Sequence, residues 1–230
     1  TMNDRERMRA IMHYENYDHM PLVCFGYWNE TLDKWAQEGH LTREEAEGWA
    51  DGNDRDYAIM RKLGFDFNWN CGIIPDSFIS PSFTPEVLET KPDGSEIRRQ
   101  SNGLIVKVKP GVVSIPAHVG TSLTGREAWE EMYLPRLRFR PDRVKEDVFR
   151  ARYRELEKLE VPIYLHLGSL YGNIRSMLGI EELSYLIADD EELYEEIVDT
   201  VGQLCYDCTE AALNLGIPFD YGHFWEDICF

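Results

Sequence analysis

The spacing of apolar and polar residues divides the chain into alternating helices and strands. Two capping boxes mark helix starts: Asn3 with Glu6, and Thr42 with Glu45, each pair three residues apart. Gly64 gives a helix stop. Helical spacing of apolar positions predicts four main helices, which cover 4–14, 54–63, 142–159 and 191–215.

Four apolar or alternating segments between the helices predict strands. They cover 22–25, 65–70, 162–167 and 218–223. Strands separated by helices pair in parallel, with the helices packed outside the sheet. Turn signals at Asp93-Gly94 and Asn102-Gly103 separate other alternating segments, so we expect an antiparallel β-hairpin excursion at about 85–120. The sequence therefore predicts an α/β fold with one such excursion.

Composition restricts the classes of partner. Lys and Arg number 24 against 42 Asp and Glu, a net charge of −18, which repels phosphate backbones and anionic membranes. Nucleic acid and membrane partners are therefore not expected. No apolar run reaches the roughly 20 residues that span a bilayer, and the charged N-terminus does not match a signal peptide. We expect a cytoplasmic protein.

The chain has few cysteines, and their number is odd. They are Cys24, Cys71, Cys205, Cys208 and Cys229. This usage is typical of a reducing compartment. Cys205 and Cys208 form a C-x-x-C motif inside a long helical pattern. We interpret them as buried apolar residues, with a redox or zinc pair as the less favoured alternative.

Several segments, in order along the whole chain, resemble the uroporphyrinogen decarboxylase superfamily. They are residues 3–13 with Asp18-His19-Met20-Pro21, residues 168–179 with Glu181-Glu182-Leu183, residues 189–193, and residues 220–227. The resemblance implies a TIM (β/α)₈-type barrel, which has eight strands and typically about 250 residues. Four predicted strands would make this chain the first half to two-thirds of a single barrel domain over 1–230. We expect a missing C-terminal segment, or a second copy of the chain, to complete the barrel.

Departures from the decarboxylase pattern favour one branch of the superfamily. Where those enzymes carry an arginine-rich loop of the form R-Q-A-G-R, residues 25–30 contain no arginine. Without arginine side chains in this loop, a substrate with many carboxylates lacks the bidentate hydrogen bonds that would neutralise it. Ser176 stands where the family has a tyrosine. The resemblance thus implies a methyltransferase that acts between a small O- or N-methylated substrate and a corrinoid protein.

Other readings of the same resemblance stay open. One is a decarboxylase of a small carboxylic acid, and another is a non-catalytic subunit. The resemblance also implies zinc as a candidate cofactor, although the His-x-Cys ligand pair of zinc-using relatives is not matched at His223. The corrinoid itself would be carried by a partner protein.

Three candidate catalytic residues lie at or just after the ends of predicted strands, where parallel barrels place their active sites. Glu226 stands beside Trp225, and partial desolvation there would raise its pKa toward acid–base values. It would alternatively bind a metal with His223, or cap a helix together with Asp227. His166 and His223 are candidates because their strands should be neighbours; a hydrogen-bonded core histidine is the alternative.

Other residues near the strand ends are candidates for substrate binding. These candidates are Tyr27, Trp28, Asn68, Tyr171, Arg175, Trp225 and Asp227. The aromatic residues would line an apolar pocket, although aromatics at strand ends also serve as core. Arg175 would bind an anionic group, or form a structural ion pair with Glu181 or Glu182.

Overall fold

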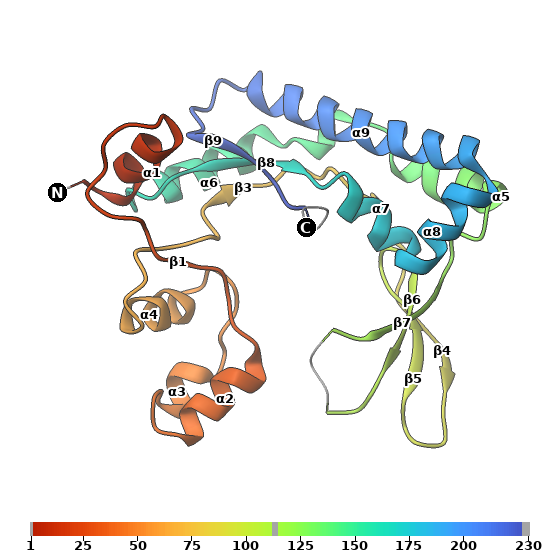
Figure 1. The fold of residues 1–230 in the computed structure, drawn as a ribbon, viewed down its shortest axis with the longest axis horizontal. Helices are drawn as coiled ribbons and strands as arrows, with labels where there is room; N and C mark the ends of the chain where they lie inside the picture. The colour runs from red at the N-terminus through yellow and green to blue at the C-terminus, as the bar shows by residue number, and fades with distance from the viewer. Residues whose placement is uncertain (1, 112–114, 227–230) are drawn as a thin grey trace. The chain divides into compact units, whose positions relative to one another are not determined.

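The computed structural model describes residues 2–111 and 115–226, which form two compact units (Figure 1). Of the described residues, the first unit comprises 2–73, 147–165 and 218–222. The second comprises 74–111, 115–146, 166–217 and 223–226. Two strands, β8 and β9, each continue from the first unit into the second.

The first unit is built mainly from short helices. Its elements are α1 (Asp4–Met12), β1 (Val23–Cys24), α2 (Asn29–Gln37), α3 (Arg43–Ala46), α4 (Asp54–Lys62), β2 (Phe67–Asn68), β3 (Gly72–Ile73) and α6 (Glu146–Glu157). Both predicted capping boxes are confirmed, at Asn3 with Glu6 and at Thr42 with Glu45. One apolar core joins the helices, in which Leu32, Leu41, Ala46 and Ile59 pack with Tyr27, Trp35, Ala36 and Trp49.

The second unit combines an antiparallel sheet with helices. Its strands are β4 (Glu86–Thr90), β5 (Glu96–Arg99), β6 (Leu104–Val108) and β7 (Ala117–Thr121), paired in that order within the segment for which hairpins were predicted. Its α-helices are α5 (Arg126–Ala128), α7 (Tyr171–Leu178), α8 (Ile180–Asp189) and α9 (Glu191–Leu213). A π-helix (Trp129–Tyr133) and 3₁₀ turns at Leu134–Arg136 and Pro141–Arg143 follow α5. No helix in residues 2–111 and 115–226 has the length and apolar content to cross a bilayer.

A three-stranded sheet in the order β3-β8-β9 positions the two predicted histidines, His166 and His223. It consists of β3, β8 (Tyr164–Gly168) and β9 (Tyr221–Phe224). β3 pairs with β8 in parallel. Backbone bonds from Asp220 to Ile163 and from Trp225 to Gly168 keep a constant sequence separation. That constancy indicates that β9 also runs parallel to β8.

The predicted TIM barrel is wrong: in the described part of the chain no sheet closes on itself. The predicted strands 22–25 and 65–70 shorten to β1 and β2, which pair with each other in a separate two-stranded sheet. A tight turn separates β2 from β3, in which the N–H of Cys71 donates to the carbonyl of Trp69 at 2.8 Å. This turn ends β2 and starts β3, which joins β8 instead. A barrel needs strands that pair on both sides until the sheet closes.

Candidate functional site

His166 and His223 face each other across β8 and β9 in the second unit. Their ring centroids lie 5.8 Å apart, with an interplanar angle of 45°. Trp225 packs edge-on against His223, with centroids 5.9 Å apart. Both imidazoles are half-buried. The predicted neighbourhood of the two histidines is therefore present.

Burial sets the charge state of this histidine pair. It lowers the pKa of His223 and of His166, and the charge of the neighbouring His223 lowers the pKa of His166 further. Since an unperturbed histidine titrates near 6.5, both rings are mainly neutral at pH 7. A neutral imidazole accepts a proton or binds a metal, so the pair is suited to either task.

Glu226 is held at the N-terminus of α7 by two backbone hydrogen bonds. The N–H of Leu170 donates to Oε1, and the N–H of Gly172 donates to Oε2 at 3.2 Å. These amides belong to the first turn of a helix, where N–H groups have no partner within the helix. The positive end of the helix dipole also favours a carboxylate. Glu226 thus caps a helix that precedes it in the chain, whereas the sequence alternative had it capping a helix that follows.

Ser169 was not among the predicted site residues, yet it lies beside this carboxylate. It is 8% exposed and follows Gly168 at the end of β8. Its Oγ packs against Gly172, closer than a Cβ at that position would tolerate. Within the described residues, Oγ has no hydrogen-bond partner. The available signal was a serine between two glycines at a predicted strand–helix junction.

The other predicted residues of the second unit lie in α7 or directly after β9. Tyr171 and Arg175 are in α7, and both are half-buried. Trp225 follows β9 directly and its N–H donates to Gly168. Asp227 lies outside the described residues. The structure therefore groups His166, His223, Trp225 and Glu226 around the end of the sheet and the start of α7.

Tyr27 and Trp28 belong to the first unit. The ring of Tyr27 packs edge-on against Trp35 and Trp49, with centroids 5.8 and 5.9 Å apart. Its hydroxyl accepts a hydrogen bond from the thiol of Cys24, and burial raises the pKa of Tyr27. Trp28 is 54% exposed at the start of α2. The structure places Tyr27 in a packed aromatic core, and a substrate-binding role for either residue stays a prediction.

Asn68 is buried in a polar network of the first unit. Its amide donates to Asp56 at 2.6 Å, and its carbonyl oxygen accepts from the N–H of Asn70 at 2.8 Å. Asp56 also accepts hydrogen bonds from Trp49 and Gly52. Both polar ends of Asn68 are thus occupied by structural partners, and its predicted contact with a substrate stays a prediction.

The structure gives zinc no complete set of ligands. Among the described residues, no three His, Cys, Asp or Glu side chains are grouped to hold a metal ion. Cys205 and Cys208 are buried on α9, as the apolar interpretation predicted. Burial raises the pKa of each thiol to about 11, so neither is poised as a thiolate.

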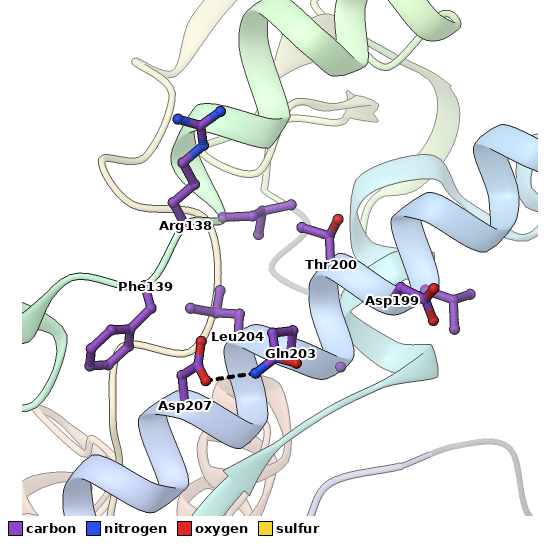
Figure 2. A pocket seen from close by; sticks show the side chains of 10 residues that line it. Arg138, Phe139, Asp199, Thr200, Gln203, Leu204 and Asp207 are labelled. Carbon is purple, nitrogen blue, oxygen red and sulfur yellow. Dashed lines mark hydrogen bonds between the residues drawn. The ribbon is translucent and has the colours of Figure 1, made fainter.

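A separate hollow of about 760 Å³ lies along α9 in the second unit (Figure 2). Its polar lining includes Arg138, Asp199 and Thr200, and Gln203 donates to Asp207 at 2.7 Å. None of the predicted site residues lines this hollow. It is therefore distinct from the histidine pair.

Comparisons with known proteins give no further assignment: no family model, no curated protein and no solved structure matches the chain.

Proposed function

We propose that the chain acts in methyl transfer between a small O- or N-methylated substrate and a corrinoid carried by a partner protein. The observation that supports this most is the pair of neutral imidazoles, His166 and His223, beside Trp225. The proposal depends on these residues and on the resemblance of several sequence segments, in the same order along the chain, to the uroporphyrinogen decarboxylase superfamily. It does not require a closed barrel.

The histidine pair supplies proton chemistry that demethylation requires. When a methyl group leaves an ether or amine, the remaining oxygen or nitrogen gains a proton. Of two neighbouring imidazoles, one can take up a proton, and its charge then opposes protonation of the other. A protonated imidazole of lowered pKa is a correspondingly stronger acid, so either His166 or His223 can deliver its proton to the leaving atom.

Substrate binding would use the apolar surface beside the pair. Trp225 offers a flat wall for a methylated group, and Tyr171 and Arg175 on α7 are the further candidates. Catalytic zinc usually has three protein ligands, and His166 with His223 supplies two. No step in this proposal therefore passes through zinc.

The test is methylation of a reduced corrinoid with a panel of methoxylated aromatics and methylamines, followed by the absorption of the methylated product. We expect turnover with at least one substrate, and a loss of about 100-fold or more in His166→Asn and His223→Asn. His40→Asn is the matched control, since the His40 side chain is 69% exposed in the other unit. Absence of methylation with every substrate, or full activity in both site variants, would contradict the proposal.

Decarboxylation of a small acid is the second candidate, and one observation favours it. The start of α7 already holds a carboxylate, that of Glu226. Release of CO₂ from a small carboxylic acid without any corrinoid would select this function over methyl transfer.

A further inference from the structure

The geometry points to a carboxylate-binding site at the N-terminus of α7, which Glu226 fills and which a small carboxylate ligand takes by displacing Glu226. The site consists of the N–H groups of Leu170 and Gly172 and the hydroxyl of Ser169. It goes beyond methyl transfer, because it assigns a ligand class that binds whether or not the histidine pair is catalytic.

The backbone part of the site already shows the binding mode. Each oxygen of Glu226 accepts one N–H, from Leu170 and from Gly172. Two N–H donors that each bind one oxygen of the same group suit a planar carboxylate. The eight-residue helix α7 adds the positive end of its dipole. Any small carboxylate can reproduce these contacts.

Ser169 is the independent observation that points to a ligand. Its side chain is more than nine-tenths buried, and its Oγ lies against Gly172 inside the first turn of α7. Within the described residues this Oγ makes no hydrogen bond, not even to Glu226. A buried hydroxyl without a partner costs about 1–3 kcal/mol, so such groups usually have a purpose. A free carboxylate ligand, unlike Glu226, is not attached to the chain, so it can accept hydrogen bonds from the two amides and the hydroxyl at the same time.

Close packing fixes the positions of these donors. Gly168 has φ +101° and leaves no room for a Cβ beside the sulfur of Cys205. Gly172 likewise leaves no room for one beside Ser169. Because both glycines are held against side chains, the loop between them is set before a ligand arrives. Such preorganisation favours binding.

The start of α9 provides a contrast in the same unit. There the side chain of Asp190 accepts the N–H of Leu193 at 3.0 Å. Asp190 also lies 3.8 Å from the guanidinium of Arg126, so its charge has an ion-pair partner. No buried hydroxyl without a partner is recorded there among the described residues. Asp190 is an ordinary cap, and this makes it the matched control for Glu226.

Glu226 acts in this scheme as a built-in competitor. A tethered carboxylate is present at an effective concentration on the order of millimolar or higher. A free carboxylate must outcompete it, so binding to the wild-type chain is weak. Displacement also releases the Glu226 carboxylate from the two amides. Glu226 is three residues from His223 in the sequence, so the released carboxylate can take part in proton transfer with it.

The experiment is a titration of the full chain with acetate, read from the backbone amide NMR shifts of Leu170 and Gly172. We expect Glu226→Ala to bind acetate at least 10-fold more tightly than wild type, with the largest shifts at these two amides. Adding Ser169→Ala to that variant should weaken acetate at least fivefold. Asp190→Ala should bind acetate no better than wild type.

Several results would overturn the site. One is an acetate affinity of Glu226→Ala equal to that of wild type, and another is shifts centred away from α7. If circular dichroism shows that Glu226→Ala is unfolded, Glu226→Gln replaces it, since the amide keeps the size but loses the charge. No gain in that variant also overturns the site. Binding of inorganic phosphate without acetate would overturn the assignment to carboxylates. Methyl transfer plays no part in these measurements, so either proposal can fail alone.

Discussion

Two carboxylates, one in each unit, accept hydrogen bonds in similar ways but in different surroundings. Asp56 is fully buried and accepts from Trp49, Gly52 and Asn68 at 3.0, 2.8 and 2.6 Å. Glu226 is half-buried and accepts two backbone N–H groups. Both polar ends of Asn68 and the carboxylate of Asp56 have partners, whereas beside Glu226 the hydroxyl of Ser169 has no hydrogen-bond partner among the described residues.

This difference separates structural polar groups from exchangeable ones. A buried network whose donors and acceptors are all matched stabilises one conformation, and losing a member leaves the others unpaired. A partly matched and partly exposed network loses less when a member leaves, because water or a ligand can replace it. We therefore assign Asp56 and Asn68 to stability and the start of α7 to binding.

The largest expected effect comes from removing the buried carboxylate of Asp56. Asp56→Ala should lower the free energy of unfolding by about 3 kcal/mol, because the buried amide of Asn68 and the half-buried N–H groups of Trp49 and Gly52 lose their acceptor. Urea denaturation measures the change. The control is Asp54→Ala, two residues away on the exposed side of α4, which we expect to change stability by less than about 1 kcal/mol. Equal losses in both variants would remove the distinction drawn for Asp56.

A smaller effect is expected at the two helix starts of the second unit. Glu226→Ala and Asp190→Ala should each lower the free energy of unfolding by about 1 kcal/mol, the usual value of a helix cap. Thermal unfolding of both variants in the absence of added carboxylates tests this. A loss at Glu226 as large as that expected at Asp56 would show that its position is structural, and the carboxylate site would then lose its basis.

Local sequence signals predicted the helices well. The capping boxes at Asn3 and Thr42 depend on residues three positions apart, and both form as expected. The stop near Gly64 and the buried Cys205 and Cys208 were likewise readable from periodicity. Each of these signals lies within one or two turns of a single helix.

Features that depend on distant partners were not predictable in this way. The predicted barrel was wrong because β2 and β3 pair in two different sheets, and the pairing of β3 with β8 joins residues about 90 positions apart in the sequence. The cap that Glu226 provides joins residues 54 and 56 positions apart. The pattern of Asn68 indicated a polar strand face but not its buried partner Asp56, which lies on α4. The proximity of His166 and His223 followed from strand order alone, since their strands pair as neighbours.

The smallest expected effect is a pH dependence of stability from the histidine pair. Burial lowers the pKa of His166 and His223 in the folded chain, while the unfolded chain takes up these protons near pH 6.5. Below that pH the unfolded state binds more protons, so stability falls as pH decreases toward the folded pKa values. The double variant His166→Gln/His223→Gln should therefore lose less stability than wild type between pH 7.5 and 5.5, measured by urea denaturation. Carboxylates titrate alike in both proteins and cancel in the comparison, and His40→Gln serves as the exposed control. An unchanged pH dependence in the double variant would mean that the two rings are not kept neutral by the fold, and the proton chemistry assigned to them would lose its support.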